Sequence, residues 1–424
     1  MKLDSYWLDT APMCSFASEG PVEGHADVAV IGGGFTGLSA ALALAKRGAS
    51  VVVLDAGRLA GGASGRNGGQ CNTGVAQDYA ALYAQLGAER ARGCYRAYAS
   101  AVETVERLIR EEAIDCDYVA SGKLKLASKP HHFEHLEKTA ELIRREVDPD
   151  IELIGRDRIA GEVASDRFYG GLLHKHGGQM HMGRFGMGLA NAAARYGARL
   201  FEHAEVTSIE KDGGAYRIAS SRGDLRAQQV LIATGPSRHG PFGWYRRRLA
   251  PVGSFIVVTE PLPPAELARL LPERRSYTTS RLMHNYFRVT PDARLLFGGR
   301  ARFTASERPS DEKSGRILQA NLAQMFPSLA SARIDYCWGG LVDITADRLP
   351  RAGQHDGLYF SMGYSGHGTQ MATHMGQMMA EVIGGNAQAN PWREFDWPAI
   401  PGHTGKPWFL PLVGTYYRIK DVFY

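Results

Sequence analysis

Cysteine, long apolar runs and blocks of like charge are all scarce in this chain. Its five cysteines form no C-x-x-C pair, which argues against a disulfide framework and a cysteine-based zinc site. The longest mostly apolar run, residues 38–45, is too short to span a bilayer. The first residues lack the apolar core of a signal peptide. We therefore expect a cytoplasmic protein in a reducing compartment, with no integral membrane association.

The charge pattern gives little reason to expect a nucleic-acid or metal partner. The net charge of +5 comes from scattered arginines, with one short basic run at residues 246–248, so nucleic-acid binding is not expected. His131, His132 and His135 lie on a helical pattern in which glutamates alternate with lysine and arginine. Such a pattern is typical of a solvated helix face, so no metal site is expected.

The most informative stretch is residues 26–56, ADVAVIGGGFTGLSAALALAKRGASVVVLDA. An apolar strand turns through Gly32, Gly34 and Gly37 into an alanine-rich helix, and a second apolar strand ends at Asp55. In such a motif the first glycine permits the tight turn, the second lets backbone approach a pyrophosphate, and the third packs the helix on the strand. A carboxylate at Asp55 accepts hydrogen bonds from a ribose diol, so the sequence predicts an FAD or NAD site over NADP.

The rest of the chain alternates between this domain and a second one. Residues 57–74 hold many glycines among polar side chains, which favours backbone lying against a ligand over a free surface loop. Residues 250–303 alternate strands with proline and glycine turns, as in an antiparallel sheet. A second glycine turn, residues 363–368, precedes a long helix over residues 369–383. We predict an α/β fold, α+β overall, with a Rossmann-like domain and a second domain on a mostly antiparallel sheet.

Five motifs together resemble the D-amino-acid oxidase family of FAD-dependent amine oxidoreductases, which includes glycine and sarcosine oxidases. They are GGGFTG with Asp55, GASGRNGGQ at 62–70, residues 178–199 followed by Val206, LIATG at 231–235, and GYSGHG at 363–368. The segments GASGRNGGQ, NYFRVTPDARLLFGG and GKPWFLPLVGTYYRIKD further resemble its gamma-glutamylputrescine oxidase-like members. The resemblance implies FAD as the cofactor, a small-molecule amine as the substrate, and oxygen or an electron carrier as the acceptor.

The resemblance also divides the chain between an FAD-binding and a substrate domain. The FAD-binding domain is expected to comprise residues 1–114, 165–245 and 336–424, the last with the C-terminal tail. The substrate domain is expected to comprise residues 115–164 and 246–335.

Each motif receives an implied role in holding FAD. Val206 would hold the adenine through its backbone, and residues 366–369 would bring a helix N-terminus to the pyrimidine edge of the flavin. Some relatives tether the flavin through a histidine or a cysteine; here Arg66 replaces that histidine and Cys337 is displaced along the chain, so we predict non-covalent FAD. The residues implied to contact FAD are Gly32, Gly34, Phe35, Thr36, Gly37, Asp55, Ala56, Gly62, Ala63, Ser64, Arg66, Asn67, Gly68, Gly69, Gln70, Val206, Ala233, Thr234, Gly235, Gly340, Gly363, Gly366, His367, Gly368 and Thr369.

The implied reaction is hydride transfer from the carbon beside an amine to the flavin, followed by hydrolysis of the imine to an aldehyde. A polyamine-type or gamma-glutamylated amine is the expected substrate. The residues implied to act on it are His367, Arg300, Tyr286, Trp338 and Tyr364. Arg288 is a further candidate, and a substrate carboxylate would need Arg300 or Arg281. For each of these except His367, core packing or a structural ion pair remains an equal alternative. His367 stands between glycines at the start of a helix, which leaves little for it to pack against.

The electron acceptor is left open between two readings. Oxidases of this family often carry a lysine near the flavin, and the strand RLLFGGR has none, although Arg294, Arg300 or His367 could supply the charge. The alternative is a dehydrogenase that passes electrons to a quinone or carrier protein, with the tail, residues 408–424, as a docking surface. We expect that tail instead to pack across the FAD-binding domain. A third reading is a flavoprotein without turnover, and the oligomeric state and the role of Cys71 stay open.

Overall fold

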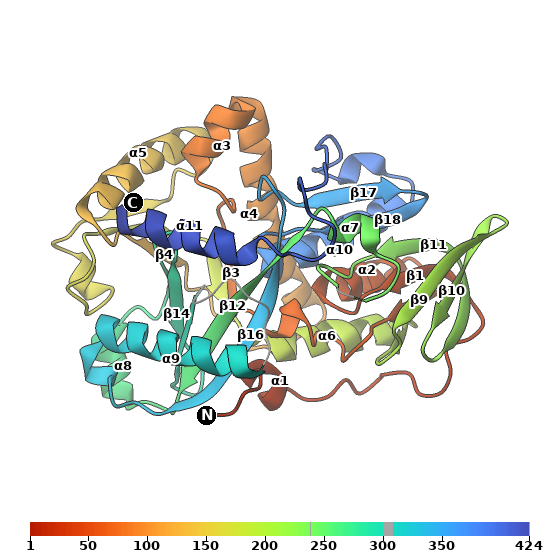
Figure 1. The fold of residues 1–424 in the computed structure, drawn as a ribbon, viewed down its shortest axis with the longest axis horizontal. Helices are drawn as coiled ribbons and strands as arrows, with labels where there is room; N and C mark the ends of the chain where they lie inside the picture. Colours follow the sequence, from red (N-terminus) through yellow and green to blue (C-terminus); the bar gives the residue numbers. More distant parts are fainter. Residues whose placement is uncertain (238, 300–307, 424) are drawn as a thin grey trace.

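The computed structural model describes residues 1–237, 239–299 and 308–423, which are arranged around two large sheets (Figure 1). The first sheet has the strand order β17-β18-β11-β1-β2-β8, and β10 and β9 extend it from β11. From β18 to β8 neighbouring strands are parallel. Its strands are β1 (His25–Ile31), β2 (Val51–Leu54), β8 (Arg199–Phe201), β9 (Val206–Asp212), β10 (Ala215–Ser220), β11 (Gly223–Ile232), β17 (Arg351–His355) and β18 (Leu358–Met362).

The central strands of the first sheet are buried on both faces, which explains their uninterrupted apolar runs. On one face, Val28 and Val30 of β1 pack in the core formed with three helices, α2 (Phe35–Lys46), α6 (Met182–Arg195) and α10 (Gly368–Ile383). The helix α4 (Ala88–Glu111) lies against α10. On the other face, Ala29 and Ile31 pack in a second core with the β9–β10 hairpin and α7 (Gly243–Arg246). The Rossmann-like part of the predicted fold is confirmed.

The second sheet has the order β16-β12-β15-β14-β13-β4-β6-β5 and is antiparallel except between β13 and β4. Apolar residues such as Leu124 and Tyr277 point to the face covered by helices α8 (Pro264–Leu270) and α9 (Arg308–Met325). Their strand neighbours Lys123 and Thr278 therefore point to the opposite face. The strands are β4 (Lys123–Leu126), β5 (Glu152–Ile154), β6 (Gly171–His174), β12 (Ala250–Thr259), β13 (Ser276–Thr279), β14 (Asn285–Val289), β15 (Leu295–Gly299) and β16 (Ile334–Ile344).

Short elements join the two sheets. The strands β3 (Gln70–Asn72) and β7 (Gly177–Gln179) form a two-stranded ladder. Helix α1 (Tyr6–Thr10) packs on α6, while α3 (Tyr79–Leu86) packs on α4 and α5 (Pro130–Glu146). No helix of the described ranges is both long and apolar enough to cross a membrane.

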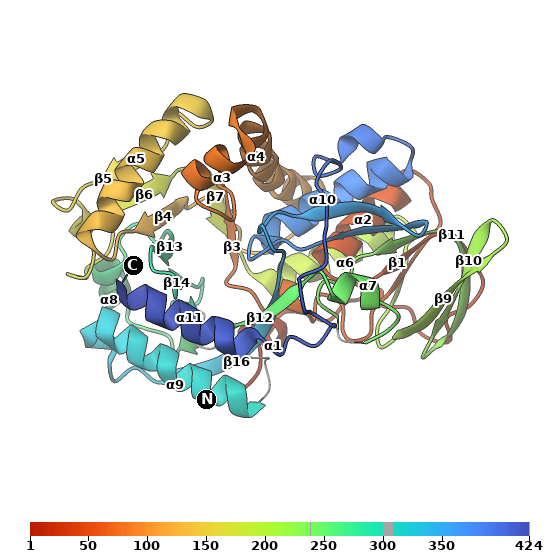
Figure 2. The same ribbon diagram turned by 45° about the horizontal axis from the view of Figure 1, so that its top comes forward.

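The C-terminal helix α11 (Leu410–Phe423) corrects one expectation. It runs beside α9 on the side of the second sheet in both views (Figures 1 and 2), and not across the FAD-binding domain. Asp421 fixes it there by accepting hydrogen bonds from the backbone N–H groups of Leu282 and Met283, at 2.8 and 3.3 Å.

The division into domains stays a proposal, and the sheets suggest two changes to it. Strand β16 pairs with β12 along its whole length, from Ile334 to Ile344, so it crosses the expected boundary between residues 335 and 336. Strand β6 belongs to the second sheet but lies beyond the expected boundary at residue 164. We therefore propose that the substrate domain extends to the ends of β6 and β16.

Candidate active site

A cavity of about 690 Å³ lies between the two sheets. Its walls come from the glycine turn after β1, the end of β11, residues 62–72, the inner face of the second sheet, and the turn before α10. Among the residues expected to contact FAD, the lining includes Gly32, Gly34, Phe35, Thr36, Asp55, Gly62, Ala63, Ser64, Arg66, Asn67, Gly68, Gln70, Ala233, Thr234, Gly235, Gly340, Gly366, His367, Gly368 and Thr369. Among the expected substrate residues it includes Tyr286, Tyr364 and His367.

The three glycines of the first turn have three different environments. Gly32 has φ +108°, which a residue with a side chain rarely adopts. Gly34 precedes α2 on the cavity wall, and a Cβ there would meet only Ser64 Oγ, at 3.0 Å. A Cβ on Gly37 would overlap the carbonyl oxygen of Gly32, so the helix can approach the turn this closely only with glycine. These positions match the three expected roles, while binding itself stays a prediction.

Asp55 closes the cavity wall beside the glycine turn. Its carboxylate accepts hydrogen bonds from the N–H groups of Gly33, at 2.7 Å, and Gly57, at 2.8 Å. Burial raises the pKa of this carboxyl, although these two bonds oppose the shift. The open backbone at Gly34, the N-terminus of α2 and a carboxylate on the next strand together fit a dinucleotide.

The segment 62–70, which we call the flavin loop, is held by its own polar side chains. The Asn67 amide oxygen accepts from the N–H of Gly69, at 2.9 Å, and from the Thr369 hydroxyl, at 3.3 Å. Ser64 Oγ accepts from the N–H of Phe35 at 3.0 Å. Arg66 donates to the carbonyl of Gly61 at 3.0 Å. The loop is thereby tied to the first turns of both α2 and α10.

Six expected contact residues do not line the cavity. Trp338 is fully buried and donates from its indole nitrogen to the carbonyl of Arg66 at 3.0 Å, so it supports the flavin loop from behind instead of facing a substrate. Val206 is buried at the start of β9, away from the lining. The remaining four are Gly37, Ala56, Gly69 and Gly363.

The aromatic candidates sit in different surroundings. Tyr364 is buried, and its hydroxyl is bonded to Thr36 Oγ1, at 2.8 Å, and Ser361 Oγ, at 2.9 Å. Tyr286 is partly exposed on the cavity wall, with its hydroxyl 3.2 Å from Ser254 Oγ. His367 precedes α10 and packs edge to face on the Tyr98 ring, with the centroids 5.5 Å apart. This contact corrects the expectation that His367 has little to pack against.

The arginine candidates do not line the cavity where the structure describes them. Arg300 lies outside the described residues. Arg288 is buried and donates to the carbonyls of Gly69 and Met180, at 2.6 and 2.8 Å, and burial lowers its pKa to about 9. Arg281 is exposed and lies 3.6 Å from the Asp421 carboxylate.

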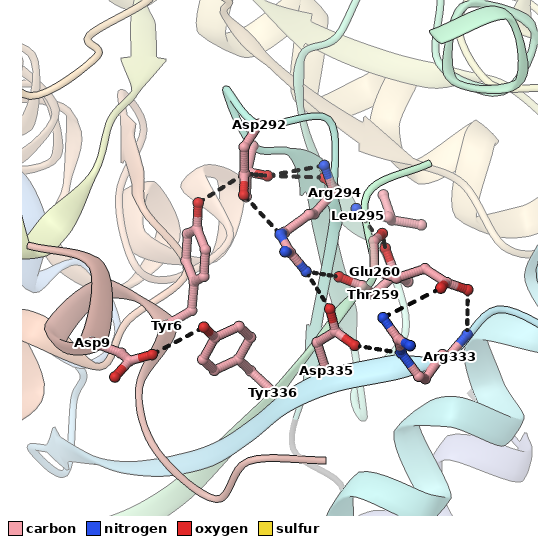
Figure 3. A network of polar contacts seen from close by, with 11 residues as sticks. Tyr6, Asp9, Thr259, Glu260, Asp292, Arg294, Leu295, Arg333, Asp335 and Tyr336 are labelled. Carbon is pink, nitrogen blue, oxygen red and sulfur yellow. Dashed lines mark hydrogen bonds and ion pairs between the residues drawn. The ribbon is translucent and has the colours of Figure 1, made fainter. Parts of the chain in front are cut away.

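Arg294 belongs to a polar network that does not contribute to the cavity lining (Figure 3). It donates to the carboxylates of Asp292 and Asp335, each at 2.7 Å, and to the carbonyl of Thr259 at 2.8 Å. The Tyr6 hydroxyl donates to Asp292 at 2.7 Å, so the network ties α1 to the second sheet. Arg294 therefore does not line the cavity, and its charge is paired with two carboxylates.

Several lining residues were missed from the sequence. The new ones with chemically active side chains include Lys123, Asn72, Asp343, His284, Ser254, Thr278 and Gln370. Burial lowers the pKa of Lys123 to about 8 and raises that of Asp343 to about 6. The alternation KLKL at residues 123–126 marks a half-buried strand, but nothing in the sequence tells which face meets the cavity.

The cysteines are turned away from the cavity. Cys337 is buried, and its thiol donates to the carbonyl of Asp311 in α9 at 3.2 Å. Cys71 is buried in β3, and burial raises the pKa of its thiol. Neither residue lines the cavity.

Comparison with known proteins shows which family and which proteins this chain is similar to. Residues 27–382 match the family model described as FAD dependent oxidoreductase. The chain is 33% identical over 405 residues to a gamma-glutamylputrescine oxidoreductase of Escherichia coli, covering 93% of this chain and 92% of that protein. It is 33% identical over 407 residues to a probable oxidoreductase of Rhizobium meliloti, covering 95% and 94%.

The solved structures show the fold. The glycine oxidase of Geobacillus kaustophilus superimposes with a TM-score of 0.74 at 22% identity, covering 90% of this chain and all of that one. An L-proline dehydrogenase of P. horikoshii superimposes with a TM-score of 0.69 at 22% identity, covering 85% of this chain and 94% of that one.

Proposed function

This chain belongs to the family of FAD-dependent oxidoreductases, and from that premise we propose that it oxidises an amine at the carbon beside the nitrogen. FAD, when bound, supplies the acceptor for the hydride that this carbon loses. The product is an imine, which water hydrolyses to an aldehyde. We further propose a gamma-glutamylated or polyamine-type amine as the substrate, oxygen as the final acceptor, and peroxide as the second product.

The observation that carries this proposal is the shared cavity. The glycine turn of the first sheet and the inner face of the second sheet line one continuous space. A small molecule held by the second sheet therefore lies within reach of a cofactor held by the first. The relative from Escherichia coli, named for gamma-glutamylputrescine, favours an amine of that class.

The protein contributes position, low polarity and a helix terminus. The ring of Tyr286 is fixed between two glycines: a Cβ on Gly68 would lie 2.7 Å from it, and a Cβ on Gly298 would lie 2.6 Å from its hydroxyl. An aromatic wall of this kind attracts an arriving ammonium. Exclusion of water then favours the neutral amine, whose lone pair promotes loss of the hydride. The N-terminus of α10 stabilises negative charge that develops at the cavity.

The carboxylates of the described lining are committed to backbone. They are Asp55, which bonds Gly33 and Gly57, and Asp343, which accepts from the N–H of Gly363 at 2.6 Å. We therefore propose that positioning and desolvation, and not a strong carboxylate base, drive the step. We also propose that the FAD is non-covalent, because Cys337 points to α9 and Arg66 stands in the flavin loop.

A dehydrogenase that passes electrons to a quinone or carrier protein is the second candidate. Strand β15, Leu295–Gly299, carries no lysine. Helix α11 also leaves Leu412, Tyr416 and Ile419 exposed at helical spacing, with exposed fractions of 66, 58 and 58%, as a docking surface would.

The test is an anaerobic reduction followed by admission of air. The purified yellow protein is mixed with gamma-glutamylputrescine, putrescine, sarcosine, glycine and D-alanine in turn, and the flavin absorbance is followed. Bleaching by gamma-glutamylputrescine or putrescine, and rapid return of colour with peroxide, is the expected result. Slow return of colour in air would favour the dehydrogenase. No bleaching by any of these amines would refute the proposed substrate class.

A further inference from the structure

Lys123 places a positive charge on the cavity wall contributed by the second sheet. It opens β4, and its neighbours in the ladder are His174 of β6 and Ser276 of β13. Leu124 points the other way, into the apolar core under α8 and α9. The Lys123 side chain is therefore partly buried and is accessible from the cavity.

The charge on Lys123 has no partner in the protein as far as the structure describes it. No hydrogen bond or ion pair of its ammonium is found among residues 1–237, 239–299 and 308–423. Lys125, on the same face two residues on, differs because the Asp78 carboxylate lies near it and favours its charged form. His174 is neutral, since burial and Lys123 lower its pKa to about 3. A cation enclosed without a counter-charge is suited to bind an anion.

Asn72 adds a second unsatisfied group close to Lys123. Residue Gly177 pairs with Asn72 in the β3–β7 ladder, and its carbonyl accepts from the N–H of Gly122 at 3.0 Å. Asn72 is therefore connected to Lys123 through the backbone of Gly177 and Gly122, the residue before the lysine, and both side chains line the cavity. The side-chain oxygen of Asn72 is buried and has no hydrogen-bond partner in the described structure. It can accept an N–H from a ligand whose anionic group reaches Lys123.

We propose that Lys123 and Asn72 form a subsite for the remote head group of the substrate, a carboxylate accompanied by an N–H donor. This inference rests on the proposed amine oxidation and specifies its substrate class. The oxidised carbon would then lie at the other end of the molecule, toward the glycine turn and the flavin loop. A simple diamine is disfavoured because its second ammonium would meet Lys123, and like charges repel.

The test compares three amines by anaerobic stopped-flow reduction of the holoenzyme, in which the dependence of the reduction rate on amine concentration gives each Kd. The amines are gamma-glutamylputrescine, its analogue in which an amide replaces the carboxylate, and putrescine. In the wild type we expect the carboxylate form to bind most tightly. In Lys123→Met, its Kd is expected to rise roughly tenfold or more, as for loss of a charge-assisted hydrogen bond. The Kd of the amide analogue should change less than twofold, and putrescine should bind more tightly than before.

Lys125→Met is the matched control. It removes a lysine from the same face of the same strand, but this lysine, unlike Lys123, has a carboxylate nearby. It should leave the preference for the carboxylate form unchanged. Asn72→Asp is a second variant that retains the shape of the side chain and places a negative charge beside Lys123. It should also weaken the carboxylate form selectively, so the proposal stays testable if Lys123→Met does not fold.

Different failures have different meanings. If wild-type flavin is reduced by none of the amines, the proposed function fails. If it is reduced but the carboxylate and amide forms bind alike, only the subsite is refuted. Equal weakening of all three amines in Lys123→Met would indicate a structural role. A slower reoxidation by oxygen with unchanged Kd values would assign the lysine to the acceptor step and overturn the proposal.

Discussion

The two ends of the cavity are built from different parts of the chain. At the first sheet, the wall is mainly backbone from glycine turns, and its key side chains, Asp55 and Asn67, bind other backbone groups. At the second sheet, the wall is made of side chains such as Lys123, Thr278 and Tyr286 that alternate with core residues along their strands. We propose that the first end fixes the cofactor class and that the second end distinguishes substrates.

The largest expected effect comes from adding one methyl group at the first end. In Gly37→Ala the new Cβ overlaps the Gly32 carbonyl oxygen, so helix and turn must separate. We expect a loss of at least about 3 kcal/mol in the free energy of unfolding, together with loss of bound FAD. Thermal denaturation and the flavin-to-protein absorbance ratio measure both.

Gly93→Ala is the matched control. Gly93 lies inside α4 with nothing within 4 Å of a new Cβ, so this change should be neutral or stabilise by up to about 1 kcal/mol. Normal FAD content in Gly37→Ala would contradict the close-packing role.

Asp55→Asn tests the first end more gently. The amide keeps the shape of the carboxylate, but its NH2 group is a donor where the carboxylate had an acceptor. This NH2 group would face the N–H group of either Gly33 or Gly57. We expect the Kd of FAD to rise roughly thirtyfold, about 2 kcal/mol. The Kd of the amine in the FAD-saturated enzyme should not change. Fluorescence titration of the apoprotein gives the first value, and an unchanged FAD affinity would refute the ribose-binding role.

Tyr286→Leu should impair the reaction with the amine and spare FAD binding, the reverse of what we expect for Asp55→Asn. Removal of the aromatic wall and of the bond to Ser254 loosens the substrate, so we expect the rate of anaerobic reduction to fall roughly tenfold. FAD affinity should remain that of the wild type. Stopped-flow absorbance measures the rate. A matching fall in FAD affinity would show that the two ends are not separable.

The pH dependence of substrate preference tests the second end of the cavity without any mutation. The pKa of Lys123 is lowered to about 8 by burial, so the lysine is cationic below that pH and loses its charge as the pH rises above it. The Lys125 ammonium and the His174 imidazole face the same region, and His174 is already neutral.

We therefore expect kcat/KM for gamma-glutamylputrescine, divided by that for its amide analogue, to fall roughly fivefold from about pH 7 to about pH 9. The ratio removes the titration of the reacting amine, which both compounds share. A ratio that is flat in the wild type, or equally steep in Lys123→Met, would rule out this lysine as the cause.

The smallest effect is expected at Cys337. Because its thiol donates to Asp311 in α9 and does not face the cavity, Cys337→Ser should leave the FAD content and absorbance spectrum unchanged. Acid precipitation of the wild type should release all the flavin into the supernatant. Flavin that stays with the protein pellet would show a covalent bond.

The sequence predicted the first end of the cavity better than the second. Backbone-binding motifs are local: Gly32, Gly34 and Asp55 lie within one strand, turn, helix and strand, so their spacing alone fixes their arrangement. The second end gathers β3, β4, β12, β13 and β14 from distant parts of the chain. Only pairings such as Ser276 with Lys123 determine which side chains meet there.

The arginines also show that sequence alone does not predict which distant groups a side chain will contact. Arg288 lies within a strand and Arg294 directly before one, and the sequence does not tell whether the partner of such an arginine is a carboxylate or a carbonyl. Arg288 is held by two carbonyls and Arg294 by two carboxylates, both within the protein. The sequence does not single out Lys123, because its strand has the pattern of an ordinary half-buried strand.

The alternation along the second sheet has a practical consequence for engineering. Positions 123, 254, 278 and 286 line the cavity, whereas positions 124, 255, 277 and 287 carry the apolar core. Saturation mutagenesis at the first four positions would vary the chemistry of the wall while the core that supports it stays intact. A compact four-site library could therefore redirect this scaffold to new amines, a freedom that a wall made of backbone does not offer.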